Sequence, residues 1–387
     1  MLKEKLKKML SPQTIAKLRQ INQLHEKTSI VIPSGSGRSL MYSFLTEKSN
    51  KVLIICRNED KAYRLALDLE SWTNEHAFVF PQREVLPFES IPESPPVVGQ
   101  RISVLSKALK GEGRFFITTI QAIETAIIPP ESLKTSLRTF TVGERLSYDA
   151  TINYLANVGY KRLPQVDGPG QFSIRGDILD IYPLIGEPFR LELFDDEIDS
   201  IRYFNPEDQR SIEAIKTIEI LPAREFFYSQ ENFAEAKIKI ETELIRQIEK
   251  LKHGNFYQEA TELEEKVRGD LEKFAEGQGF DGEIGYLPYF YGNNNLFFDY
   301  VNPDLVIVED REELFYSTEQ WLKEISESMS LLMAKGRVLP SVFANFHNFY
   351  DLEEKVKKCQ ELYVNEIEEQ ESKAEFRLRH PIYTRAR

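Results

Sequence analysis

Short β-rich runs alternate with helical patterns in the first third of this chain, and this alternation limits the possible folds more than any other feature. The runs rich in β-branched and aromatic residues are 29–32, 51–56, 77–80 and 115–118. Segments 61–72 and 100–109 carry the apolar spacing of helices. Because strands that are joined through helices run parallel, the pattern predicts an α/β fold with helices on a parallel sheet. The apolar run 305–308 predicts that the chain later returns to this sheet.

The rest of the chain divides into three further parts. After Pro129 and Pro130, β-rich runs separated by Gly-Pro turns follow one another up to about residue 222. Residues 231–277 carry two apolar stripes at helical spacing with a break at 253–255, which predicts an antiparallel helical hairpin. The predicted segments are 1–130, the first part of the α/β domain; 131–222, an inserted β-rich domain; 223–364, the hairpin and the return to the α/β domain; and 365–387, a linker to a further domain.

The composition excludes several classes of protein. The chain has 49 Lys and Arg residues against 62 Asp and Glu residues, a net charge of −13, whereas a nonspecific DNA clamp needs a basic surface. Two cysteines and five scattered histidines predict neither a disulfide scaffold nor a metal site. No apolar stretch approaches the roughly 18 residues of a membrane span. Residues 1–8 form a basic amphipathic pattern rather than a signal peptide, so we expect a cytoplasmic protein.

The loop after the first predicted strand has part of the pattern of a phosphate-binding loop, G-x-x-x-x-G-K-[ST]. Gly37 and Ser39 fit this pattern and Gly35 lies within it, but Ile32 replaces the first glycine and Arg38 replaces the lysine. A planar guanidinium does not fit the site of a compact ammonium group. Two interpretations remain open. The loop is either vestigial or binds a nucleotide through Arg38.

A matching acidic motif ends the strand at 305–308. Glu309 and Asp310 stand where an NTPase holds its metal ion, but their order is reversed and Arg311 follows directly. Solvated charges at a strand end are the simpler interpretation of this pair alone. Together, the two degraded motifs indicate an ATPase ancestry with the chemistry lost, so we expect no cofactor and no metal in this chain.

The β-rich segment carries a candidate protein-binding face. Strict alternation in the strand 189–194 places Arg190, Glu192 and Phe194 on the side away from the apolar core. An exposed aromatic ring beside an arginine is typical of interface hot spots. The alternative is that a neighbouring loop covers Phe194.

Two longer stretches, 171–183 and 190–204, resemble the signature of the UvrB interaction domain. This domain is shared by the excinuclease protein UvrB and the bacterial transcription-repair coupling factors, and the resemblance extends over most of the chain. The sequence departs from UvrB in its phosphate loop, in its acidic motif and in the absence of an aromatic β-hairpin between residues 118 and 133. It therefore resembles the amino-terminal module of a coupling factor, with a degenerate helicase-like P-loop domain.

The resemblance implies a function. The β-rich domain would bind the damage-recognition protein UvrA and recruit it to RNA polymerase stalled at DNA damage, without catalysis by this chain. The contact residues carried over by motif position are Arg175, Arg190 and Phe194, with Glu192 and Arg202 nearby. Stalled polymerase and DNA would be bound by other parts of the longer protein, whose translocase domains would use ATP and magnesium. Nothing in the sequence demands more than a monomer. The alternatives are an ATP-dependent, helicase-like repair enzyme of the UvrB type, or a β-rich domain that acts only as an internal clamp.

Overall fold

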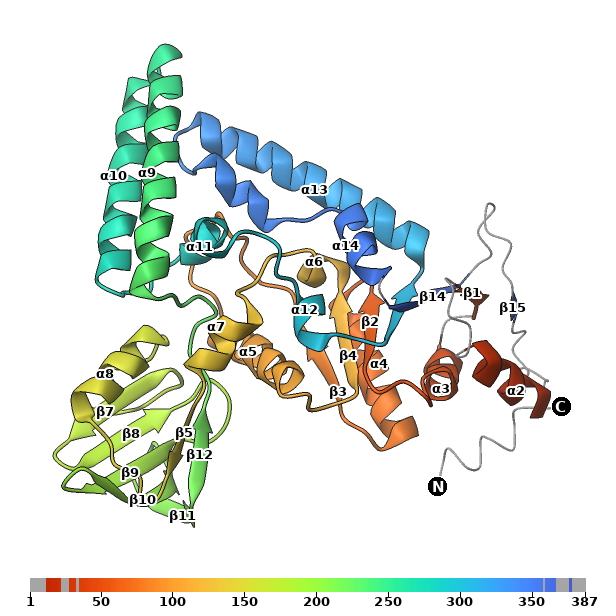
Figure 1. Ribbon diagram of the computed structural model, residues 1–387, viewed down its shortest axis with the longest axis horizontal. Coiled ribbons are helices and arrows are strands. Elements are labelled where there is room, and N and C mark those ends of the chain that lie inside the picture. Colours follow the sequence, from red (N-terminus) through yellow and green to blue (C-terminus); the bar gives the residue numbers. More distant parts are fainter. Residues whose placement is uncertain (1–11, 22–27, 33–34, 358, 367–375, 378–387) are drawn as a thin grey trace.

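A seven-stranded parallel sheet forms the centre of the computed structural model (Figure 1). The structure describes residues 12–21, 28–32, 35–357, 359–366 and 376–377. The strand order is β15-β1-β14-β13-β2-β4-β3. The strands are β1 (Thr28–Val31), β2 (Val52–Cys56), β3 (Ala77–Phe80), β4 (Phe115–Thr119), β13 (Leu305–Glu309), β14 (Gln360–Asn365) and β15 (Phe376–Arg377). The predicted parallel sheet and the predicted return at 305–308 are thus confirmed. The sequence did not predict β14, which lies between β1 and β13.

Helices cover both faces of the sheet, which explains why its strands are apolar at consecutive positions. In β2, Leu53 and Ile55 belong to one hydrophobic cluster, and Val52 and Ile54 belong to the other. The second cluster packs against α2 (Pro12–Ile21), α3 (Ser36–Leu45) and α4 (Glu59–Thr73). The first packs against α5 (Pro95–Leu109), α6 (Ile120–Ile123), α12 (Phe297–Val301) and α14 (Phe349–Val356). The long helix α13 (Arg311–Ala334) follows β13.

The β-rich domain has a sheet and a hydrophobic core of its own. The strand order is β11-β10-β9-β8-β7-β6. Its elements are α8 (Tyr148–Asn157), β6 (Lys161–Arg162), β7 (Gln171–Arg175), β8 (Ile178–Tyr182), β9 (Phe189–Phe194), β10 (Glu197–Phe204) and β11 (Ser211–Ile215). The domain is joined to the rest through β5 (Arg138–Thr141) and β12 (Thr217–Ile220), which pair antiparallel with each other. The predicted boundary at 130/131 falls within α7 (Pro130–Ser136). This helix contacts α5 of the α/β body, so the β-rich domain begins at β5.

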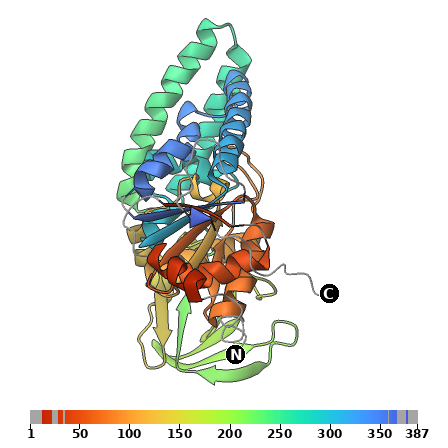
Figure 2. The ribbon, with the colours of Figure 1, turned by 90° about the vertical axis from the view of Figure 1, so that its right-hand side faces the viewer.

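The helical hairpin stands at the opposite end of the molecule from the β-rich domain (Figure 2). It consists of α9 (Gln230–His253) and α10 (Tyr257–Ala275), which pack along each other. Ser229 and Asn232 form a capping box at the start of α9, and Gly254 lies at its end. Two short elements, η1 (Glu283–Tyr286) and α11 (Leu287–Tyr291), lead from the hairpin back towards the sheet. A further short element, η2 (Pro340–Asn345), lies between α13 and α14.

Two sequence predictions fall on residues that the structure does not describe. These are the amphipathic pattern at residues 1–8 and most of the linker at 365–387. Within the described part of the chain, no helix combines the length and the apolar character that crossing a bilayer requires.

Candidate partner-binding site

Phe194 is the most exposed large hydrophobic side chain among the described residues. It is the last residue of β9, and 79% of it is accessible to solvent. Asp195 follows with a φ of 61°, a left-handed conformation that Asp tolerates in a tight turn. The alternative interpretation, that a loop covers Phe194, is therefore wrong.

Arg190 lies on the same side of the sheet but is not a free surface side chain. Only 12% of it is exposed, because the fully buried Asp180 stands directly opposite on β8. Arg190 Nε donates to Asp180 Oδ1 at 2.6 Å, and Nη2 donates to Oδ2 at 2.9 Å. This two-bond geometry is the strongest form of an arginine–carboxylate contact. Arg190 thus lies on the side away from the apolar core, but the strand register brings a carboxylate against it.

A second arginine binds the same carboxylate from the other side. Arg175 on β7 donates from Nη2 to Asp180 Oδ2 at 2.8 Å, and its side chain is 43% exposed. Gln209, which has a φ of 61°, accepts from both guanidinium groups at 3.4 Å through Oε1. The Arg190 guanidinium also lies 4.9 Å from the centre of the Phe204 ring. Its bond to Asp180 raises the pKa of Arg190, although partial burial opposes that shift.

Glu192 and Arg202 complete this face. Ser200 donates to Glu192 Oε2 at 2.7 Å, and Arg202 Nη2 lies 3.9 Å from the same oxygen. The strand pairing places all five sequence-predicted residues on one side of the sheet, because directly paired residues point the same way. Sequence reasoning missed Asp180. One sequence feature could have revealed it. Asp180 is an acidic residue at the centre of the otherwise apolar strand β8, and a buried carboxylate requires a charged partner.

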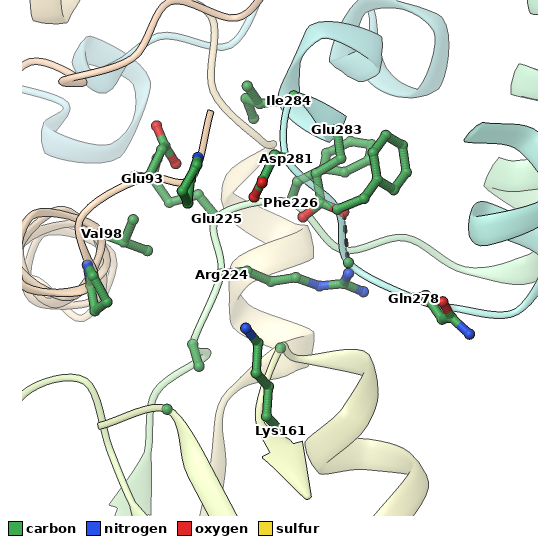
Figure 3. Close-up of a pocket in the computed structure, with 18 of the residues that line it drawn as sticks. Glu93, Val98, Lys161, Arg224, Glu225, Phe226, Gln278, Asp281, Glu283 and Ile284 are labelled. Atoms are coloured by element: carbon green, nitrogen blue, oxygen red, sulfur yellow. Dashed lines mark hydrogen bonds and ion pairs between the residues drawn. The ribbon is translucent and has the colours of Figure 1, made fainter. Parts of the chain in front are cut away.

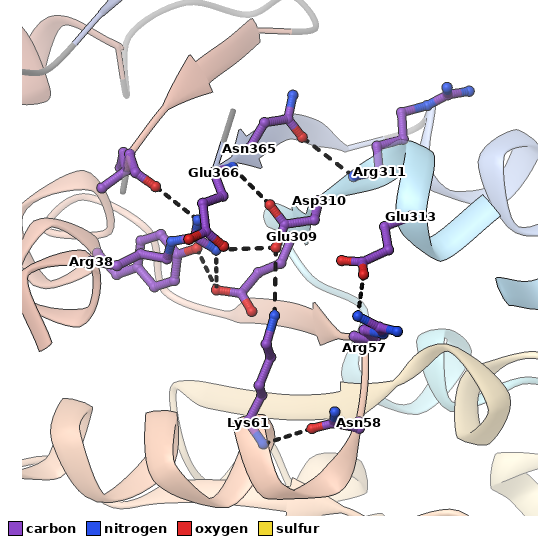
Figure 4. A network of polar contacts seen from close by, with 12 residues as sticks. Arg38, Arg57, Asn58, Lys61, Glu309, Asp310, Arg311, Glu313, Asn365 and Glu366 are labelled. Carbon is purple, nitrogen blue, oxygen red and sulfur yellow. Dashed lines mark hydrogen bonds and ion pairs between the residues drawn. The ribbon is translucent and has the colours of Figure 1, made fainter. Parts of the chain in front are cut away.

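The predicted phosphate loop and the acidic motif come together at the carboxyl ends of β1 and β13 in the large sheet (Figure 4). The buried Arg38 donates from Nη2 to the Ile32 carbonyl at 2.7 Å. Its Nη1 lies 3.5 Å from Glu309 Oε1 and 3.4 Å from Asp310 Oδ2. Burial opposes the charge of Arg38, but Tyr42 and the two carboxylates outweigh this effect and raise its pKa. Arg38 therefore neutralises the acids from within the protein.

The other loop residues point elsewhere. Ser39 donates from Oγ to Asp68 at 2.9 Å and accepts from Trp72 Nε1 at 3.1 Å, so its hydroxyl contacts α4. Gly35 has a φ of 110° and precedes α3, and Gly37 lies in the first turn of that helix. The intervening residues 33 and 34 are not described. In the described part of the chain, no three His, Cys, Asp or Glu side chains gather as metal ligands would.

A cavity of about 640 Å³ lies where the Pro-rich loop, the β-rich domain and the segment after α10 meet (Figure 3). On its wall, Arg224 Nη1 lies 3.3 Å from Glu283 Oε2, and Nε and Nη2 donate to the Asn157 carbonyl at 3.0 and 2.7 Å. Burial raises the pKa of Glu283 to about 7, although Arg224 opposes this shift. The neighbouring Glu225 is buried between Arg83 and Arg101. These contacts fix the segment that connects the β-rich domain to the body.

Comparison with known proteins agrees with this architecture. Residues 139–226 match the UvrB interaction domain family. The transcription-repair-coupling factor of Bacillus subtilis (strain 168) is 36% identical over 334 residues, which are 84% of this chain and 28% of that protein. The corresponding factor of Staphylococcus aureus (strain MRSA252) is 29% identical over 323 residues, 80% of this chain and 26% of that protein. The chain thus spans less than a third of the length of these relatives. It carries a UvrB interaction domain and is related over most of its length to the transcription-repair-coupling factors.

Proposed function

We propose that this chain is the amino-terminal module of a transcription-repair-coupling factor and that its β-rich domain binds UvrA. The observation that carries the proposal is the outer face of the UvrB interaction domain, where the exposed Phe194 ring lies on the same side as Arg175 and Arg190. Aromatic and arginine side chains contribute the largest free energies to protein interfaces. Covering an aromatic ring that is 79% exposed would remove a large apolar area from water, which favours binding.

In this proposal the bound UvrA is delivered to RNA polymerase that has stalled at DNA damage. Polymerase and DNA would be bound by parts of the longer protein outside this chain, which would act in the cytoplasm. The chain itself would act as a monomeric recruitment module. The similarity to transcription-repair-coupling factors supports this assignment.

We further propose that the phosphate loop is vestigial and that the chain hydrolyses no nucleotide. Arg38 is held between Glu309, Asp310 and the Ile32 carbonyl, so both terminal nitrogens of its guanidinium already have partners inside the protein. The competing function is an ATP-dependent repair enzyme of the UvrB type. Millimolar ATP with magnesium should leave the melting temperature unchanged, whereas a rise of several degrees would support the enzyme.

The proposal is tested by titrating the full chain with purified UvrA. We expect binding at micromolar concentration or tighter, and Phe194→Ala should weaken it about 30-fold, equivalent to the roughly 2 kcal/mol of an interface hot spot. Tyr316→Ala is the matched control, because Tyr316 is a 66% exposed aromatic residue on α13, in a different domain. Absence of binding by the folded wild-type chain would refute the proposal. Equal losses in both variants would refute the assignment to the β-rich face.

A further inference from the structure

We propose that Asp180 is a positioning residue that holds Arg175 and Arg190 in the geometry needed for partner docking. This inference rests on the proposed function, since it concerns the same face. Asp180 is fully buried at the centre of β8, between the strand that carries Arg175 and the strand that carries Arg190.

The carboxylate binds both arginines at once. Asp180 Oδ1 accepts from Arg190 Nε at 2.6 Å, and Oδ2 accepts from Arg190 Nη2 at 2.9 Å and from Arg175 Nη2 at 2.8 Å. The two guanidinium groups are therefore held together although like charges repel each other. One carboxylate against two guanidinium groups leaves an excess of one positive charge on this face.

Fixing the arginines before the partner arrives favours binding. A free arginine side chain loses much rotational entropy when an interface orders it, and this loss weakens association. Asp180 fixes the guanidinium plane of Arg190 through two parallel bonds, so that loss occurs during folding instead. Arg190 Nη1 then points towards the Gln209 carbonyl at 3.3 Å, at the rim of the face.

The geometry also indicates what kind of partner surface fits. Gln209 accepts from Arg175 and Arg190 through long bonds of 3.3–3.4 Å, so a carboxylate or carbonyl of a partner can replace it. Phe194 lies four residues from Arg190 along β9, about 13 Å at the rise of an extended strand. The face therefore fits a UvrA surface that presents acceptor groups, preferably carboxylates, about that distance from an apolar recess.

The test is an Asp180→Asn substitution in the full chain, titrated with UvrA. The amide keeps the size of the side chain but cannot accept from both arginines as a carboxylate does. We expect binding at least tenfold weaker, even though the change makes the face more positive. Asp149→Asn is the matched control, because it removes the same charge from the exposed first turn of α8. It should bind within twofold of the wild type.

A double-mutant cycle separates positioning from a general effect on the fold. Asp180→Asn added to Arg190→Ala should cost less affinity than Asp180→Asn alone, because only one of the two arginines that Asp180 positions, Arg175, then remains. Added to Phe194→Ala, it should cost its full tenfold. Arg190→Lys covers the case in which Asp180→Asn unfolds the domain. It keeps the charge beside Asp180 but loses the two-bond fork, and it too should weaken binding at least tenfold.

The outcomes are distinct. If the wild-type chain does not bind UvrA, the proposed function fails and the role of Asp180 fails with it. If the wild type binds but the folded Asp180→Asn chain binds equally well, only the positioning role is overturned. Equal losses in Asp180→Asn and Asp149→Asn, additivity with Arg190→Ala, or wild-type affinity in Arg190→Lys would also overturn it.

Discussion

Arg38 shows how the contacts of one residue can differ from those that its motif suggests. It stands where a phosphate loop has its lysine, yet it lies between Glu309 and Asp310, and Tyr42 donates to Glu309 Oε1 at 2.7 Å. In a working site the cation would bind a phosphate and the two carboxylates would hold a metal ion. In this protein the Arg38 guanidinium neutralises the two carboxylates instead. At the residue scale, the contacts of Arg38 are those of a buried residue that stabilises the fold.

Replacing Arg38 should therefore destabilise the protein. Arg38→Ala leaves Glu309 buried without its guanidinium partner, although Lys61 lies 3.7 Å from Asp310 and compensates in part. We expect a loss of about 1–3 kcal/mol in the free energy of unfolding, measured by urea denaturation, because a buried charge loses its partner.

The control is Arg57→Ala, which removes an exposed ion pair with Glu313. Exposed pairs of this kind contribute only about 0–1 kcal/mol. If the two variants lost the same stability, Arg38 would not have the buried role that its contacts indicate.

At the scale of elements, the segment after β12 joins the β-rich domain to the body through side chains on both sides. Arg224 reaches back to the Asn157 carbonyl in the β-rich domain and across to Glu283 in η1. Gly159 allows this contact, because its φ is +98° and a Cβ there would lie 2.7 Å from Arg224 Cγ. Arg224 and Glu283 thus help to fix the β-rich domain against the body.

This carboxylate should make stability depend on pH. Burial raises the pKa of Glu283 from 4.5 to about 7, against the opposing effect of Arg224. Because the folded state holds the proton more tightly, the stabilisation is complete below pH 4.5 and is lost as the pH rises through 7. The shift corresponds to at most about 3 kcal/mol.

The measurement is the free energy of unfolding between pH 5 and 8 for the wild type and Glu283→Gln. The difference between them should change across this range, because the amide does not titrate, while Arg83, Arg224 and Glu93 remain in both proteins. Glu276→Gln, an exposed position near the same cavity, should follow the wild type. A constant difference between wild type and Glu283→Gln would contradict a raised pKa.

The sequence predicted those elements whose own residues determine their burial. Strands such as β2 and β13 are apolar at nearly every position, so their place inside a sheet follows from composition. Strand β14 has the sequence Gln-Glu-Leu-Tyr-Val-Asn, and its Glu361 is buried in the fold, where Tyr363 donates to it. Asp180 was missed for a similar reason. Its contact with Arg190 depends on the register between β8 and β9, which alternation within one strand does not specify.

At the scale of the whole molecule, the β-rich domain is nearly independent of the α/β body. Its core is a separate hydrophobic cluster, which includes Phe172, Phe189 and Ile201. The chain enters the domain through β5 and leaves it through β12. The two strands pair with each other, and Arg138 at the start of β5 lies opposite Ile220 at the end of β12. An excised domain would therefore have neighbouring ends and a complete core.

We expect a fragment of residues 137–222 to fold cooperatively and to bind UvrA within a few-fold of the affinity of the full chain. All five candidate contact residues and Asp180 lie within it. Circular dichroism during thermal unfolding and the same UvrA titration would check this. A folded fragment that fails to bind, while the full chain binds, would show that the partner also contacts the body.

The pairing of β5 with β12 has a mechanical consequence. Two hydrogen-bonded strands resist sliding in their own plane, because the backbone bonds between them would have to break, but they bend more easily across their thin dimension. The strand pair is therefore stiff in its own plane and more flexible across it. Force applied to the β-rich domain by a bound partner would reach the α/β body mainly as bending about one axis. A protein bound to the β-rich domain would then change its distance from the α/β body more easily than its orientation.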